Sequence, residues 1–178
     1  MHTAYIGMGA NMASRAGAPE ATLKAAVERL SAIGKLVMCS SLYSTAPEGF
    51  KEQPRFVNAV LGLETGLAPR PLLRRLLEIE GEFGRDRFSS LPNGPRTLDL
   101  DLLIVGDLVL HEAGLDLPHP RLAERAFVLV PLHEIAPRLI EPRSRSTIEE
   151  LLNALKNELP VATDAVVRLA GRDWSVAR

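Results

Sequence analysis

The chain has 178 residues, of which 46% are hydrophobic, 24% charged and 4% aromatic, and its formal net charge is −1. At roughly 150 residues per domain this length predicts one domain over 1–178, with a core over 3–155 and a tail over 156–178. The single cysteine, Cys39, excludes a disulfide framework or a zinc cluster. The near-neutral charge argues against a protein that coats nucleic acid or an acidic membrane, whereas a small anionic ligand needs only a local cluster of positive charge.

The N-terminal sequence shows no targeting pattern. The stretch MHTAYIGMGANM lacks the basic region that begins a secretory signal, and two glycines interrupt its apolar residues. Apolar stretches elsewhere are far shorter than the roughly 20 residues of a membrane helix. We therefore expect a cytoplasmic monomer that acts on small molecules and binds neither nucleic acid nor membrane.

The first half of the chain alternates strand-like and helix-like patterns. A strand is predicted over 3–8, and apolar residues at helical spacing predict a helix that begins at Pro19 and ends at Gly34. Two more strands, over 36–43 and 56–64, enclose a loop over 45–54 that is rich in proline and glycine. The pair Gly7 and Gly9 lacks the lysine of a phosphate-binding loop, which favours a structural turn there.

The second half completes a recurrent arrangement. A helix is predicted over 69–83, with a proline in its first turn and Gly84 after its end. A long loop over 85–96 leads to a strand over 97–105 that closes in a glycine turn. The order β-α-β-β-α-β predicts an α+β protein with a ferredoxin-like core, in which a four-stranded, mainly antiparallel sheet carries both helices on one face.

Additional elements are expected after this core. A helix over 120–136 is interrupted by Pro131, and a second helix over 146–155 begins at a capping box of Ser146 and Glu149. The tail contains the sequence VVRL, which suits an additional edge strand.

Glu80 interrupts the apolar face of the helix over 69–83. At helical spacing it lies in line with leucines such as Leu72 and Leu76, on the side that should face the core. A carboxylate at that position must be paired, or must lie where the buried face opens into a functional site. The pattern leaves both interpretations open.

Two aspartates share one face of the strand over 97–105. Asp99 and Asp101 alternate with leucines, although aspartate is a poor strand former. Two carboxylates at this spacing suit Mg²⁺, which takes few protein ligands and completes its shell with water and phosphate. A solvated acidic strand face is the alternative. Arg96 and Arg85 in the preceding loop favour a site for a metal and a nucleotide.

Two loops and one histidine are weaker candidates. The loops over 45–54 and 85–96 are long for a compact domain, so they are either binding loops or unconstrained surface segments. His119 lies between two prolines, and this stiff segment could hold the ring in place for a function or serve the fold alone.

The segment GPRTLDLDLL, residues 94–103, resembles the signature of the 6-hydroxymethyl-7,8-dihydropterin pyrophosphokinase family. The resemblance extends over 3–155 and includes AYIGMGAN, SSLYSTAPEG, FVNAV, IEGEFGRDR and LPHPRLAERAFVLVPLHEIAP in the family's order. It implies a ferredoxin-like fold and, in folate biosynthesis, transfer of the β,γ-diphosphate of ATP to the pterin's hydroxymethyl group with release of AMP.

The resemblance also implies roles for individual residues. Asp99 and Asp101 would hold two Mg²⁺ ions, and Arg85 and Arg96 would clamp phosphates during catalysis. The remaining residues implied for the nucleotide site are Glu80, Arg87, His119 and Arg125. Those implied for the pterin site are Thr45, Phe56, Asn58 and Phe127, of which the two phenyl rings can sandwich a flat bicycle and the asparagine can bond its amide edge.

The chain departs from the family pattern in the loop over 85–96, where Pro92 and Asn93 replace a basic and an aromatic residue. Two other functions remain as alternatives. A different metal-dependent phosphoryl or nucleotidyl transferase would have no use for Phe56, Asn58 and Phe127 together. An RNA-binding module would need stacking aromatics on central strands and a basic face, and the sequence offers few of either.

Overall fold

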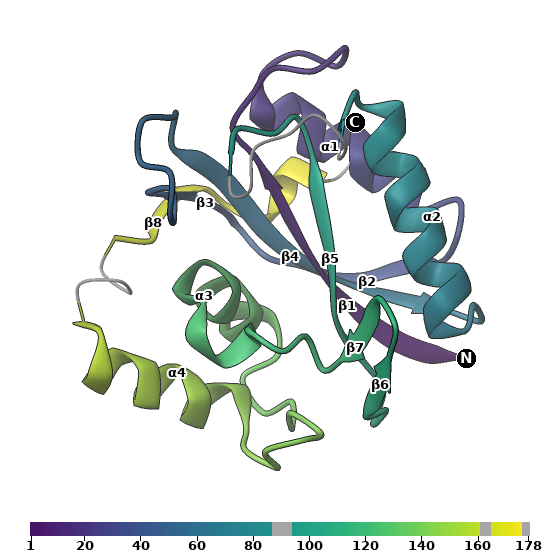
Figure 1. Ribbon diagram of the computed structural model, residues 1–178, viewed down its shortest axis with the longest axis vertical. Helices are drawn as coiled ribbons and strands as arrows, with labels where there is room; N and C mark the ends of the chain where they lie inside the picture. Colours follow the sequence, from purple (N-terminus) through teal and green to yellow (C-terminus); the bar gives the residue numbers. More distant parts are fainter. Residues whose placement is uncertain (87–93, 161–164, 176–178) are drawn as a thin grey trace.

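The protein is described by a computed structural model that covers residues 1–86, 94–160 and 165–175. Its main feature is an antiparallel sheet whose central strands, β1 (His2–Ala10) and β4 (Phe56–Thr65), pair along their whole length. β5 (Asp99–Val105) pairs with the free side of β1 and forms one edge of the sheet. The predicted α+β class and antiparallel sheet are confirmed, but the sheet of the described residues has six strands where the sequence predicted four in the core (Figure 1).

The other side of β4 pairs with two short strands where the sequence predicted a single strand over 36–43. These are β2 (Lys35–Cys39) and β3 (Leu42–Thr45). The prediction of one strand was wrong because Ser40 interrupts the ladder: its side-chain oxygen accepts the hydrogen bond of the Val60 backbone N–H at 2.9 Å. The VVRL segment contributes β8 (Val167–Ala170), which pairs with β3 as the predicted edge strand.

Helices cover both faces of the sheet. α1 (Pro19–Leu30) and α2 (Pro69–Glu82) pack on one face, as predicted, against leucines of the central strands. α3 (Ala126–Ile135) and α4 (Ile148–Glu158) pack on the other face in a second apolar cluster (Figure 1). Within the described residues no helix combines the length and the apolarity needed to cross a bilayer.

Three glycines have roles that the sequence analysis misassigned. Gly7 and Gly9 form no turn, because β1 continues through them to Ala10. Gly34 does not end α1, which stops at Leu30. A Cβ at Gly34 would lie 2.7 Å from the Glu64 carbonyl oxygen, so glycine is required there for close approach to β4.

The region between β5 and α4 differs most from expectation. A hairpin of β6 (Leu110–Glu112) and β7 (Leu115–Leu117) was not predicted. The single helix expected over 120–136 is instead a short 3₁₀ turn, Leu122–Glu124, followed by α3. The two are separated because Arg125 adopts an extended backbone conformation (φ −108°, ψ 102°).

The capping box of α4 lies one residue after its predicted position. Thr147 Oγ1 accepts from the Glu150 N–H at 3.2 Å, and the Glu150 carboxylate accepts from the Thr147 N–H at 2.7 Å. Ser146 and Glu149 satisfy the same sequence pattern, but they do not make the cap.

Thr147→Ala should lower the free energy of unfolding by about 0.5–2 kcal/mol, because the Glu150 N–H in the first turn of α4 loses the side-chain oxygen that caps it. Ser146→Ala is the matched control and should change it by less than about 0.5 kcal/mol. Urea denaturation of both variants measures the difference. Equal losses would show that the box assignment is wrong.

Candidate active site

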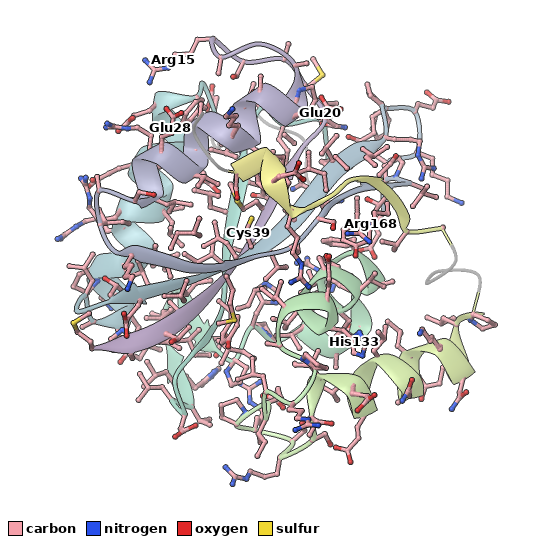
Figure 2. The ribbon with its side chains drawn as sticks, turned by 180° about the vertical axis from the view of Figure 1, so that it is seen from behind. Arg15, Glu20, Glu28, Cys39, His133 and Arg168 are labelled. Atoms are coloured by element: carbon pink, nitrogen blue, oxygen red, sulfur yellow. The ribbon has the colours of Figure 1, made fainter. Side chains whose placement is uncertain are left out.

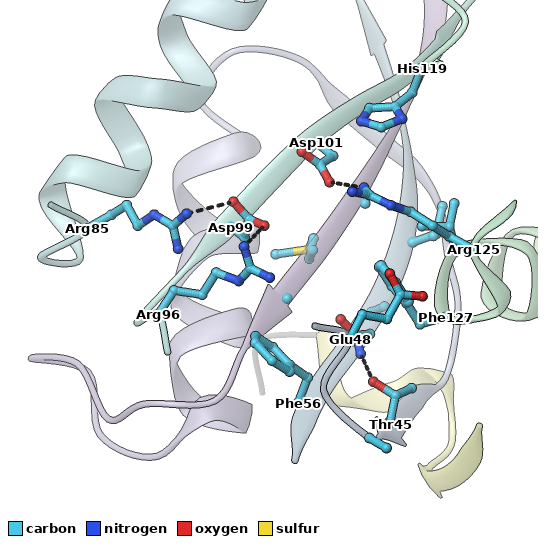
Figure 3. Close-up of a pocket in the computed structure, with 18 residues that line it drawn as sticks. Thr45, Glu48, Phe56, Arg85, Arg96, Asp99, Asp101, His119, Arg125 and Phe127 are labelled. Carbon is cyan, nitrogen blue, oxygen red and sulfur yellow. Dashed lines mark hydrogen bonds and ion pairs between the residues drawn. The ribbon is translucent and has the colours of Figure 1, made fainter. Parts of the chain in front are cut away.

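A cavity of about 210 Å³ opens where β1, β4 and β5 meet the loop after β3 and the start of α3. It brings together most of the site residues predicted from the sequence (Figure 3). Those that line it are Thr45, Phe56, Asn58, Arg85, Arg96, Asp99, Asp101, His119, Arg125 and Phe127. Concave sites with converging polar groups are where proteins bind small molecules.

The two aspartates reach the cavity because β5 has the predicted alternation. Asp99 and Asp101 line the cavity, whereas Leu98, Leu100 and Leu102 are buried in the core on the opposite face. The register of β5 on β1, which sets Asp101 opposite Gly7 and Asp99 opposite Gly9, fixes both carboxylates at the cavity floor.

Each aspartate is paired with arginine. Asp99 lies 3.5 Å from Arg85 and 3.1 Å from Arg96, and Asp101 lies 3.3 Å from Arg125, measured between nitrogen and oxygen (Figure 3). The arginines come from the end of α2, the loop before β5 and the residue before α3. All three pairs are largely shielded from solvent, so bulk water and salt screen them less than surface pairs.

Two of these arginines also contact aromatic rings. The Arg96 guanidinium carbon lies 4.9 Å from the centre of the Phe56 ring, and that of Arg125 lies 5.5 Å from the Phe127 ring. Both distances are within the range of cation–π attraction. Each guanidinium therefore connects one carboxylate at the floor of the cavity with one phenyl ring in its wall.

Asn58 is held in a fixed orientation. Its Nδ2 donates to Thr45 Oγ1 at 2.6 Å, and its Oδ1 lies where a side chain at Gly9 would stand, 2.8 Å from an ideal Cβ. Gly9, one of the two glycines that the sequence analysis assigned to a turn, thus leaves room for a buried amide. Gly7 and Gly9 also line the cavity.

The environment shifts the pKa values of two groups in opposite directions. Burial, and then the charge of Asp99, raise the pKa of Asp101, while Arg125 and His119 oppose the shift. Burial is also the main cause that lowers the pKa of His119, so its ring is uncharged at pH 7. His119 Nδ1 accepts from the Arg121 N–H at 3.1 Å, which leaves the ring proton on Nε2.

Glu80 lies behind β5 and does not line the cavity. Its side chain is buried, with 1% exposure, and Oε1 accepts from the Leu100 N–H at 2.7 Å. Because β5 is an edge strand, its outward N–H groups lack a strand partner. Glu80 supplies that partner between Asp99 and Asp101, which explains a carboxylate on the core face of α2. Arg87, Pro92 and Asn93 lie outside the described residues.

The donor set of the cavity floor fits a hard divalent cation. Asp99 and Asp101 offer carboxylate oxygens, and in the described parts of the chain no cluster of three or more His, Cys, Asp or Glu side chains forms a closed metal site. Mg²⁺ commonly uses one or two carboxylates together with substrate phosphates. The geometry thus suits metal that arrives with a phosphorylated ligand.

A second cavity, of about 300 Å³, adjoins the first and was not anticipated from the sequence. Its lining comes from α2, β5, the β6–β7 hairpin and the segment after β7. Leucines of these elements, such as Leu73, Leu102 and Leu115, lie there beside the polar side chains of Asp116 and His119. Asp101 and His119 line both cavities. A ligand with a flat apolar end and a charged tail could therefore occupy both.

Glu48 is a further lining residue that the sequence analysis did not select. It lies in the loop after β3, whose unusual length was the available signal, and its carboxylate is 3.5 Å from Arg121.

Comparison with known proteins places these features in a family. Residues 5–137 match the family described as 7,8-dihydro-6-hydroxymethylpterin-pyrophosphokinase. The chain is 46% identical over 150 residues to a 2-amino-4-hydroxy-6-hydroxymethyldihydropteridine pyrophosphokinase of Pseudomonas aeruginosa, with 84% of this chain and 90% of that protein covered. A protein of the same description from Haemophilus influenzae is 42% identical over 151 residues, with 84% and 91% covered.

Solved structures support the fold. The HPPK-DHPS protein of Plasmodium falciparum superposes with a TM-score of 0.72 at 15% identity, and the match covers 94% of this chain. This chain spans 47% of that longer protein, so the similarity concerns one part of it and the fold alone.

Glu80→Leu should lower the free energy of unfolding by about 1–3 kcal/mol, because the buried Leu100 N–H loses its acceptor. Glu80→Gln keeps an acceptor oxygen and should lose less. Glu78→Leu, at an exposed position of the same helix, is the control and should change the value by less than about 1 kcal/mol. Urea denaturation tests this order, and a Leu variant as stable as the wild type would show that Glu80 does not anchor β5.

Proposed function

The chain belongs to the 7,8-dihydro-6-hydroxymethylpterin-pyrophosphokinase family, and on that premise we propose how its residues divide the work of the reaction. The enzyme transfers the β,γ-diphosphate of ATP to the hydroxymethyl group of 6-hydroxymethyl-7,8-dihydropterin and releases AMP, a step in folate biosynthesis. The main support for our assignment is one cavity in which two phenyl rings and a fixed amide adjoin two carboxylates and three arginines.

The pterin binds between the phenyl rings of Phe56 and Phe127. Their faces suit a flat bicyclic ring, and stacking buries its apolar surface. Asn58 recognises the amide edge of the pterin, since the bond from Nδ2 to Thr45 leaves its Oδ1 as an acceptor for a ring N–H. This orientation directs the hydroxymethyl group toward the aspartates.

The nucleotide spans both cavities. The adenosine end occupies the second cavity, against the leucines of α2 and β5, and the phosphates pass Asp101 and His119 into the first. The Nε2–H of His119 donates to a phosphate oxygen, which an uncharged ring with this tautomer can do.

Asp99 and Asp101 are the residues that would hold Mg²⁺, and we propose two ions. Metal bound there would supply positive charge that neutralises the triphosphate and would help to orient the attacking hydroxyl. The carboxylates of Asp99 and Asp101 fix where the β-phosphorus meets the pterin.

Arg85, Arg96 and Arg125 bind the phosphates in this account. Each guanidinium has several donors in a planar fork, and a phosphate ester matches this geometry as well as a carboxylate does. The arginines that pair with the aspartates in the structure thus also lie within reach of the transferred group. Preformed positive charge at that position stabilises the charge that develops during transfer.

The proposal includes further assignments outside the cavity. Glu80 serves the nucleotide site through β5, as its bond to Leu100 suggests. Arg87, which lies outside the described residues, is proposed as a further phosphate-binding residue on the family resemblance alone. The whole chain acts as a single domain and as a cytoplasmic monomer.

Product analysis tests the proposed function. The purified protein with ATP, Mg²⁺ and 6-hydroxymethyl-7,8-dihydropterin should release AMP in step with the diphosphorylated pterin, and chelation of the metal should stop both. Asp101→Asn should slow this by at least about 100-fold, because a neutral amide ligates Mg²⁺ poorly. ADP as the product would indicate transfer of a single phosphoryl group, and absence of any product would contradict the proposal.

A further inference from the structure

Glu134, near the end of α3, accepts hydrogen bonds from two distant parts of the chain, the start of β3 and the C-terminal segment. Its Oε2 accepts from the Ser41 N–H at 2.7 Å and from the Tyr43 hydroxyl at 3.0 Å. Its Oε1 accepts from Ser41 Oγ at 2.7 Å, from Arg172 at 3.1 Å and from Arg168 at 3.3 Å. One carboxylate, with a side chain only 15% exposed, is therefore saturated with donors.

The charge of Glu134 is stabilised by this arrangement. Burial opposes its ionisation, but hydrogen bonds from Ser41, Arg172 and Tyr43 outweigh burial and hold the pKa of Glu134 below its usual value. Conversely, burial and the bond to Glu134 raise the pKa of Tyr43 to about 12, so its hydroxyl stays protonated as a donor. The network is thus intact at neutral pH.

Glu134 joins the two walls of the pterin cavity. Its own helix, α3, carries Phe127 at the opposite end. Its partners Ser41 and Tyr43 lie at the start of β3, which carries Thr45 and pairs with β4 at Asn58 and Phe56. The distance between α3 and β3 determines how far Phe127 stands from Phe56 and Asn58.

The two arginines come from the C-terminal segment, residues 165–175, which lies beyond the family match over 5–137. Its strand β8 extends the sheet beside β3, with Arg168 opposite Tyr43. Figure 2 shows Arg168 on this strand next to α3. Arg172 also donates to the Glu134 carbonyl oxygen at 2.6 Å, and Trp174 Nε1 donates to the Ser40 carbonyl oxygen at 2.8 Å.

We propose that Glu134 is a positioning residue for the pterin site, and that Arg168 and Arg172 of the C-terminal segment hold it in place. The inference rests on the proposed function, because the cavity walls that it fixes are the assigned pterin site. The segment contacts neither Asp99 nor Asp101, and the second cavity lies on the other side of β5. Its influence therefore falls on pterin affinity and not on nucleotide affinity.

If the two arginines served stability alone, their loss should affect the fold and not the binding site. Arg168 and Arg172 are each more than half exposed, and exposed ion pairs contribute little to stability. A binding site, in contrast, requires its walls to be held within about 0.5 Å of the productive geometry. Loss of one arginine should therefore disturb the site more than the fold.

The test measures equilibrium binding of 6-hydroxymethyl-7,8-dihydropterin and, separately, of a non-hydrolysable ATP analogue with Mg²⁺, using the full chain. Arg172→Ala and Glu134→Gln should weaken pterin binding at least about fivefold and leave analogue binding within about twofold. Arg172→Lys, which keeps the charge, should recover part of the loss. Arg138→Ala, at an exposed position four residues after Glu134, is the control and should match the wild type.

The outcomes distinguish the positioning role of Glu134 from the assignment of the cavity to the pterin. Unchanged pterin affinity in Arg172→Ala and Glu134→Gln, whatever their melting temperatures, would overturn the positioning role, as would an equal loss for both ligands. Failure of the wild type to bind the pterin would instead overturn the assignment of the cavity. A pterin-specific loss with partial rescue by lysine would support the inference.

Discussion

Two carboxylates held side by side on an edge strand require positive charge, and the rest of the site follows from how that charge is supplied. Asp99 and Asp101 share one shielded face of β5, where burial, and then the charge of Asp99, raise the pKa of Asp101. Arginines from three separate segments converge on them at 3.1–3.5 Å. The strand itself is fixed between β1 on one side and Glu80 on the other. A metal with a phosphorylated substrate can satisfy the same carboxylates, and phosphates can satisfy the same arginines.

This arrangement links the charged and aromatic parts of the cavity. Arg96 and Arg125 each contact one aspartate and one phenyl ring, so movement of a guanidinium toward phosphate changes the surroundings of Phe56 or Phe127. Glu134 joins α3 and β3, the elements that carry these walls, at the ends that lie away from the arginines. The proposed pterin site is thus bounded by arginines at the cavity floor and by the C-terminal segment behind β3.

Local patterns in the sequence were sufficient for the fold and for the centre of the site. Alternation along β5 placed both aspartates on one face, and helical spacing identified Glu80 as a carboxylate directed at the core. Features that depend on contacts between distant residues were missed. The break at Ser40 depends on a side-chain bond to Val60, and the second cavity is formed by leucines of three elements that look like ordinary core residues. The capping box of α4 fitted two adjacent positions equally well, and only backbone geometry selects Thr147.

We propose that the arginines neutralise the same two carboxylates, Asp99 and Asp101, that bind metal. The most direct test is to measure Mn²⁺ binding to the nucleotide-free protein by electron paramagnetic resonance. Removal of Arg125 frees Asp101 from its cationic partner, so Arg125→Ala should bind Mn²⁺ several-fold more tightly than the wild type. Arg29→Ala is the control, because Arg29 pairs with Glu82 and neither residue lines the cavity. Unchanged or weaker Mn²⁺ binding by Arg125→Ala would contradict the account.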